Sequence, residues 1–166
     1  MGTDTEILET AYLVRTDHEI KIEEIIKSDR FAWCFDNKLK LEDFLNTKVF
    51  PPTRRGKSFE NIRFIPAKDL ESFHWSEMNI SIKEILAELD KLGYRAVEIR
   101  ELLAFGNAFF HLQTKNPIIA LGSIGIIKEK IKIATGLCCR DMKATAIVIC
   151  PEEYFSMKCF LAVIDK

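Results

Sequence analysis

The sequence predicts a single α+β domain, with two or three helices in the N-terminal two-thirds of the chain and a mainly antiparallel sheet in the C-terminal part. Apolar residues repeat with the period of a helix turn most clearly between residues 80 and 112. From residue 116 onward the chain consists of short β-branched segments, and their connections are too short for the helical crossovers that parallel strands need. With 166 residues the chain has the length of one domain. Within it we distinguish a strand and helix portion, 1–79, from a helix pair followed by an antiparallel sheet, 80–166.

The N-terminal portion alternates short strands and short helical segments. Ile22, Ile25 and Ile26 share one helical face, which predicts a helix there. Pro51 and Pro52 interrupt the chain because proline suits neither a helix interior nor a central strand. The predicted helical segments are 20–27, which Ser28 and Asp29 terminate, and 39–45. The predicted strands are 11–15, 31–35 and 59–67, the last of them half-buried through Phe59, Ile62 and Phe64.

The clearest helix begins after Ser81. Ser81 and Glu84 have the spacing of a capping box, in which each side chain accepts a hydrogen bond from the backbone of the other. Gly93 suits the left-handed position that follows a helix. The expected apolar stripe consists of Ile82, Ile85, Leu86 and Leu89.

A second helix is predicted over residues 98–112. Its inward face contains Ile99, Leu102 and Leu103. Gly106 weakens its middle by about 1 kcal/mol relative to alanine, so this is where the helix would most easily break. Glu98 and Glu101 are expected to cap its first turn, where acidic side chains offset the positive end of the helix dipole.

Residues 116–123, NPIIALGS, raise the question of a phosphate-binding loop. Such loops need GxxxxGK[ST] or GxGxxG spacing before a helix, and neither spacing is present. We therefore interpret the segment as a buried strand that leads to a surface loop at 123–125. Loops of this kind often carry recognition residues.

Composition narrows the possible functions. The net charge of −1 provides no general attraction to nucleic acid or to an acidic membrane. No segment reaches the roughly 18 apolar residues of a membrane span, and no export signal is apparent at the N-terminus. The five cysteines lack zinc-type spacing, so we expect reduced thiols and no metal. We also expect no cofactor, and reduced thiols without an export signal predict a cytoplasmic location. Arg54, Arg55 and Lys57 could contact phosphates, but without interleaved aromatic residues nucleic-acid binding is not favoured.

The stretch LGYRAVEIRELLAFGNAFFHLQTKNPIIALGS, together with KCFLAVI near the end, resembles a family of small bacterial proteins of unknown function. Their shared pattern is GYRPATxxELLAF, a segment that ends in LQ, then PIVALGS and a final FLAV strand. This chain departs from the pattern at 96–98, where Ala-Val-Glu replaces Pro-Ala-Thr. The matching positions are Tyr94, Arg95, Glu101, Leu102, Leu103, Gln113, Pro117, Ala120, Leu121, Gly122 and Ser123.

The same segments are more distantly similar to C-type lectin-like folds and to formylglycine-generating domains. That similarity implies a lectin-like arrangement of the α+β fold. It implies no activity, because the sugar-binding triplets and the two-cysteine copper site of those proteins have no counterpart here.

The leading hypothesis is a non-catalytic intracellular module that binds a ligand or a protein partner. The alternative is a small enzyme whose site is assembled from remote residues, which would require two of them to converge in a pocket. No residue is assigned a catalytic role under the leading hypothesis. Its candidate binding residues are Ser123, Gly125, Arg140, Glu152 and Tyr154, whereas the enzyme alternative draws on His74, His111, Cys138 and Glu101.

Overall fold

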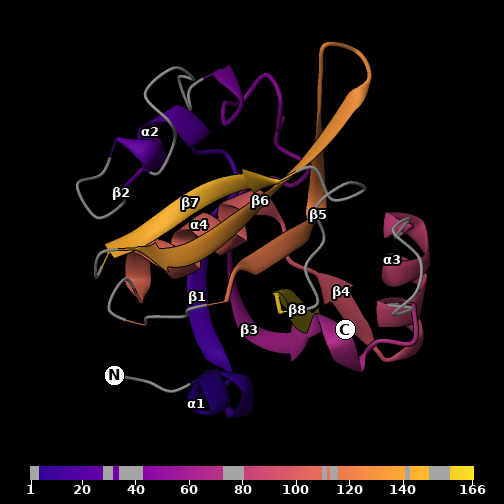
Figure 1. The fold of residues 1–166 in the computed structure, drawn as a ribbon. Coiled ribbons are helices and arrows are strands. Elements are labelled where there is room, and N and C mark those ends of the chain that lie inside the picture. The colour runs from indigo at the N-terminus through magenta and orange to yellow at the C-terminus, as the bar shows by residue number, and fades with distance from the viewer. Residues whose placement is uncertain are drawn as a thin grey trace.

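A computed structural model (Figure 1) describes the chain over residues 4–27, 32–33, 43–72, 81–109, 112, 116–140, 143–149 and 158–166. The predicted helical turn at 39–45 and the strand at 31–35 fall only partly within these residues. Within the predicted strand at 31–35 the structure has a two-residue strand, Ala32–Trp33.

One eight-stranded sheet organises the described chain. Its order is β1-β3-β8-β5-β6-β7-β2, and β4 pairs with β8 in addition. All pairs are antiparallel except β5 with β8 and β2 with β7, so the α+β class and the mainly antiparallel sheet are as predicted. The strands are β1 (Tyr12–Asp17), β2 (Ala32–Trp33), β3 (Lys57–Pro66), β4 (Tyr94–Ala96), β5 (Ile118–Ile127), β6 (Ile131–Arg140), β7 (Lys143–Ile149) and β8 (Phe160–Asp165).

The last strand, β8, lies in the middle of the sheet and joins the two portions of the chain. One of its edges pairs with β3. Its other edge pairs with β5 through Phe160 and Leu161 and with β4 through Val163–Asp165. The sheet therefore extends beyond the C-terminal part of the chain and includes the N-terminal strands β1 and β3.

Both faces of β8 are buried because successive side chains of a strand point to opposite faces. Phe160, Ala162 and Ile164 belong to one apolar cluster, and Leu161 and Val163 belong to a second. The first cluster lies between the sheet and α4 (Ile99–Ala108), and the second lies between the sheet and α3 (Ile82–Lys91). Helices on both faces thus allow the central strand to be apolar throughout.

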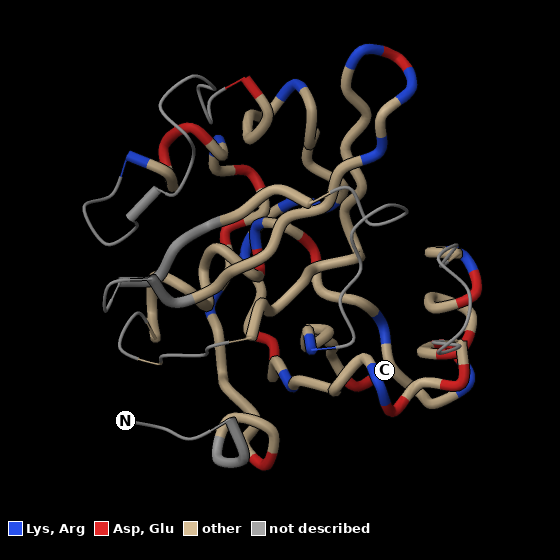
Figure 2. Tube along the Cα trace, in the orientation of Figure 1, with Lys and Arg blue, Asp and Glu red and all other residues tan. Residues whose placement is uncertain are grey.

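Four helices and one 3-10 turn cover the sheet in the described residues. Figure 1 shows α4 in the centre of the molecule near β1, and α3 at the opposite side next to β4. Figure 2 shows charged residues mainly on helices and connections, whereas the central strands are mostly uncharged. The bounds are α1 (Asp4–Glu9), α2 (Ile22–Ile26), the 3-10 turn η2 (Ala67–Asp69), α3 (Ile82–Lys91) and α4 (Ile99–Ala108).

The predicted start and end of α3 are confirmed, and of the two hydrogen bonds of the capping box the structure shows the one that Ser81 accepts. The side chain of Ser81 accepts a hydrogen bond from the backbone N–H of Glu84 at 3.4 Å. Gly93 follows the helix with a φ of 83°, a left-handed conformation that favours glycine. Local sequence chemistry is sufficient to start and end this helix.

The structure corrects two predictions about neighbouring elements. The helix predicted over 98–112 ends at Ala108, and Gly106 lies buried within it without a break. Phe59, assigned to the half-buried alternation of its strand, is 66% exposed, because β3 buries Ile62 and Phe64 on the opposite face.

Residues 123–125 do not form the surface loop that the sequence suggested. The strand is confirmed, but β5 continues through them to Ile127, and the register with β6 shifts between Ala120 and Gly125. The turn comes later, at 128–130. Such a bulge keeps a strand paired while it bends, and a single sequence gives no clear signal for it.

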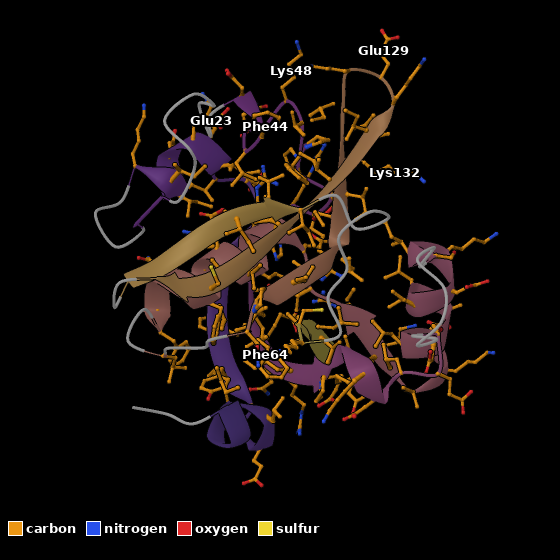
Figure 3. All side chains as sticks on the ribbon, viewed as in Figure 1. Glu23, Phe44, Lys48, Phe64, Glu129 and Lys132 are labelled. Atoms are coloured by element: carbon orange, nitrogen blue, oxygen red, sulfur yellow. The ribbon has the colours of Figure 1, made fainter. Side chains whose placement is uncertain are left out.

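An aromatic cluster fixes α4 against the first strand. The Tyr12 ring lies 5.4 Å from that of Phe105 and 5.1 Å from that of Phe109, measured between ring centroids. Phe64, labelled in Figure 3, adds a third contact from β3 to Phe105 at 5.1 Å. These edge-to-face contacts stabilise by more than their buried area alone. They hold α4 in a fixed position beside β1.

Candidate functional site

The motif residues Arg95 and Glu101 form a buried ion pair where β4 meets α4. Arg95 donates two hydrogen bonds to the two carboxylate oxygens of Glu101, at 2.9 and 2.8 Å. The Glu101 side chain is fully buried, and its Oε2 also accepts the backbone N–H of Glu98 at 2.8 Å. This contact forms part of a capping box, so the predicted capping role of both glutamates is confirmed.

Further charges surround this pair and satisfy one another. The Arg95 guanidinium also lies 3.4 Å from the carboxylate of Glu60. Arg54 reaches Glu98 at 3.3 Å, and Thr53 donates a hydrogen bond to the same carboxylate at 2.7 Å. Although burial opposes it, the contacts with Glu101 and Glu60 raise the pKa of Arg95. Every charge in this cluster has a partner, which favours a structural role. We call the cluster, which consists of Arg54, Glu60, Arg95, Glu98 and Glu101, the joint.

Gly122 and Ser123 belong to the same joint. The Ser123 hydroxyl accepts the backbone N–H of Ile99 at 3.1 Å, which adds a cap at the start of α4. Gly122 donates its N–H to the Val97 carbonyl at 2.9 Å. A Cβ on Gly122 would lie 2.6 Å from the carbonyl oxygen of Ala96, so only glycine allows β5 this close to β4.

Of the other candidate binding residues, the structure describes Gly125 and the backbone of Arg140. Gly125 is buried, and a Cβ there would lie 2.6 Å from the Val49 side chain and 2.8 Å from Phe50. Arg140 ends β6, where its backbone pairs with Lys143. Glu152 and Tyr154 lie outside the described residues, so their convergence with Ser123 stays a prediction.

Two of the four residues of the enzyme alternative, Glu101 and Cys138, lie in the described chain. His74 and His111 lie outside it. Glu101 uses both carboxylate oxygens inside the joint. Cys138 is half-buried on β6 and pairs in register with Thr145. The described residues therefore test only one pair of the four, Glu101 and Cys138, and convergence that involves either histidine stays a prediction.

A pocket lies elsewhere in the described residues, between β1, α2 and α4. We call it the β1 cleft. Its volume is about 270 Å³. A shallower hollow at Glu19, Gly56 and Lys57 shares three of its residues and extends it outward. Its lining residues are Arg15, Asp17, Ile20, Glu24, Ile25, Arg100, Ala104 and Asn107.

Arg100 is the unusual residue of the β1 cleft. It is only 4% exposed, and its guanidinium donates to two backbone carbonyls, those of Ile20 at 3.0 Å and Phe50 at 3.2 Å. Its Nη2 has no hydrogen-bond partner, and no described carboxylate forms an ion pair with it. Buried charges in proteins are normally paired, since removing a lone charge from water costs several kcal/mol.

The electrostatics of the cleft follow from this missing counter-ion. Burial lowers the pKa of the Arg100 guanidinium, whereas the charges of Glu98 and Glu23 act in the opposite direction without pairing with it. Arg100 also lies in the first turn of α4, where the helix dipole disfavours a cation. At the rim, Asp17 lies 3.8 Å from the ammonium of Lys57, and Glu24 is exposed without a described partner.

The basic loop contains Arg54, Arg55 and Lys57. Arg54 is held by glutamates of the joint, and Lys57 faces Asp17. Two of its three cations therefore already have acidic neighbours, which compete with phosphate groups.

Sequence reasoning missed Arg100. Its one local signal is a basic residue in a first helical turn, where acidic residues are preferred.

No group of at least three histidine, cysteine or acidic side chains in the described residues is arranged to hold a metal ion. In the same part of the chain, no helix is long and apolar enough to span a membrane. Comparison with protein-family models, with curated proteins and with solved structures finds no match to this chain.

Proposed function

We propose that this protein is a non-catalytic binding module of the cytoplasm whose ligand occupies the β1 cleft and places an anionic group against Arg100. The observation that carries the proposal is the buried Arg100 guanidinium without a counter-ion in the wall of a cavity. An anionic group is the partner that such a cation lacks. Carboxylates and phosphates both match the geometry of a guanidinium.

The remaining walls suit a small ligand with an apolar part. Ile20, Ile25 and Ala104 line the cleft beside the charged groups. Ligand sites in proteins are concave and mostly apolar, with a few polar groups that fix orientation. The cytoplasmic location is supported by Cys138 and Cys159, which are both free thiols, as is usual in a reducing compartment.

The test is thermal unfolding of the purified protein with defined anions. We would add acetate, N-acetylglycine, succinate or inorganic phosphate, each against chloride at equal ionic strength, and acetamide as the uncharged counterpart of acetate. A probe present at a hundred times its Kd stabilises the protein by about 2.7 kcal/mol. For a chain of this size that raises Tm by several degrees, roughly 2–4 °C per kcal/mol. We expect at least one carboxylate or phosphate to raise Tm more than its control.

Two arginine variants separate the cleft from general charge effects. Arg100→Met removes the buried cation and should abolish the anion-dependent rise in Tm. Arg63→Met removes a half-exposed cation that pairs with Asp165 at 3.1 Å, outside the cleft, and should retain the rise. An equal rise in both variants, or no rise with any probe in the wild type, would contradict the proposal.

A further inference from the structure

The β1 cleft lies along an open edge of the sheet. β1 is the terminal strand on its side of the described sheet, and its outer edge pairs with no described strand. The cleft is lined by Arg15 and Asp17 from this strand and by Arg100 and Ala104 from α4. A groove between an edge strand and a helix can accept another extended chain, because an edge strand presents unpaired backbone groups.

The hydrogen-bond alternation of β1 shows which backbone groups face outward. The N–H of His18 donates to the carbonyl of Gly56 at 2.9 Å, directly beyond the pair Asp17 and Lys57. In an antiparallel ladder, hydrogen-bonded pairs alternate with pairs whose N–H and C=O point away from the partner strand. The backbone groups of Leu13, Arg15 and Asp17 therefore point to the outer edge.

Two independent features thus coincide in one groove. Arg15 and Asp17, whose backbone groups face outward, are the β1 residues that line the cleft. Arg100, the cation without a described counter-ion, lies in the facing wall on α4. A ligand that meets both would carry backbone N–H and C=O groups at strand spacing together with an anionic group.

We infer that the ligand is the C-terminal end of an extended peptide, which adds to the outer edge of β1 and places its terminal carboxylate against Arg100. This inference rests on the proposed function and names its ligand class. The cavity of about 270 Å³ corresponds to roughly nine water molecules at about 30 Å³ each. That space suits a terminal residue and its carboxylate, with the preceding residues along the open edge.

The rim adds a preference to this ligand class. Glu24 is exposed beside the cleft, and no described residue pairs with its carboxylate. A basic side chain near the end of the peptide would pair with it. The bound sequences should therefore be enriched in lysine and arginine just upstream of the terminal residue.

The experiment selects peptides from a pool of random heptapeptides with a free C-terminus on the immobilised full-length protein. The same pool with an amidated C-terminus is selected in parallel, and retained peptides are identified by mass spectrometry. We expect free-acid peptides to be retained about tenfold or more above their amidated forms, because amidation removes the charge that pairs with Arg100.

Two variants of one residue test the strand addition. Arg15→Ala and Arg15→Pro both remove the side chain, including its contact with the Phe59 ring. Only proline removes the outward N–H, and it leaves the ladder to β3 intact because this N–H is not used there. We expect Arg15→Pro to bind a selected peptide about tenfold more weakly than Arg15→Ala. Arg100→Met should lose the preference for the free acid.

Each outcome bears on a different part of the inference. Equal retention of free and amidated peptides would overturn the role of the carboxylate. Equal binding by the two Arg15 variants would overturn the strand addition. If small carboxylates raise Tm but no peptide is retained, the peptide inference fails while the proposed function stands. If neither small anions nor peptides bind, both proposals fail together.

Discussion

Arg95 and Arg100 lie five residues apart around the start of α4, yet their environments are opposite. Arg95 has a bidentate carboxylate partner in Glu101 and a second one in Glu60. Arg100 is more deeply buried but has only two carbonyl partners, and one of its nitrogens has none. In the first site every charge has a partner within the protein, whereas the second lacks an anion.

The difference separates a residue that holds the fold together from one that is available to a ligand. A buried ion pair with full hydrogen bonding fixes the geometry of the elements that meet there. A buried cation without its counter-ion lowers the stability of the folded state, which proteins commonly accept at sites of function. The two arginines should therefore respond in different ways to the same substitution.

Replacing Arg95 should have the largest effect. Arg95→Met removes both hydrogen bonds to the fully buried Glu101 carboxylate and leaves it with Arg54, at 3.9 Å, as its remaining described cation. Removing one partner of a buried pair costs about 3–5 kcal/mol. Urea denaturation with a common m-value would measure this loss. The double variant Arg95→Met with Glu101→Leu removes both charges and should recover most of it. A loss below about 1 kcal/mol in the single variant would mean that the joint is not a source of stability.

The same change at Arg100 should cost far less. Arg100→Met removes an unpaired buried cation, which offsets the loss of its hydrogen bonds to the carbonyls of Ile20 and Phe50. We expect the free energy of unfolding in the absence of ligand to change by no more than about 1 kcal/mol. A loss as large as that of Arg95→Met would place Arg100 among the structural residues and remove the contrast.

The helix caps, including those in the joint, could be predicted from the sequence, whereas the cleft could not. Ser81 and Gly93 act on residues close in the chain, so their roles in α3 could be predicted. The same locality made the capping roles of Glu98 and Glu101 predictable. The matching positions of the resemblance include Arg95, Glu101 and Ser123, although the interpretation placed Ser123 in a surface loop rather than in β5.

The cleft could not be predicted because its defining contacts are distant in sequence. The carbonyls that hold Arg100 belong to residues 80 and 50 positions away, and nothing in the sequence beside Arg100 indicates them. The open edge of β1 depends on the order of strands in the sheet. That order places β8, the last strand, next to β3 and leaves β1 terminal among the described strands.

The smallest expected effect concerns Glu23, which lies on α2 near the cleft and is labelled in Figure 3. Hydrogen bonds from the hydroxyl and the N–H of Thr47, at 2.6 and 3.1 Å, lower the pKa of its carboxyl below the ordinary 4.5. A group whose pKa is lowered by folding stabilises the protein above its unfolded value, and this contribution disappears as the pH falls through the folded value. The Glu23 contribution should therefore be fully present at pH 7 and be lost below about pH 4.5.

Glu23→Gln measures that contribution. The variant should be less stable than the wild type at pH 7 by less than about 1 kcal/mol, and the difference should shrink in acid. Urea denaturation at several pH values between 7 and 3 would follow it, with Glu24→Gln as the neighbouring control that lacks the Thr47 contacts. A constant difference across this range would show that Glu23 does not stabilise through its charge. A shrinking one would show that Glu23 stabilises through its charged form, which accepts the hydrogen bonds from Thr47.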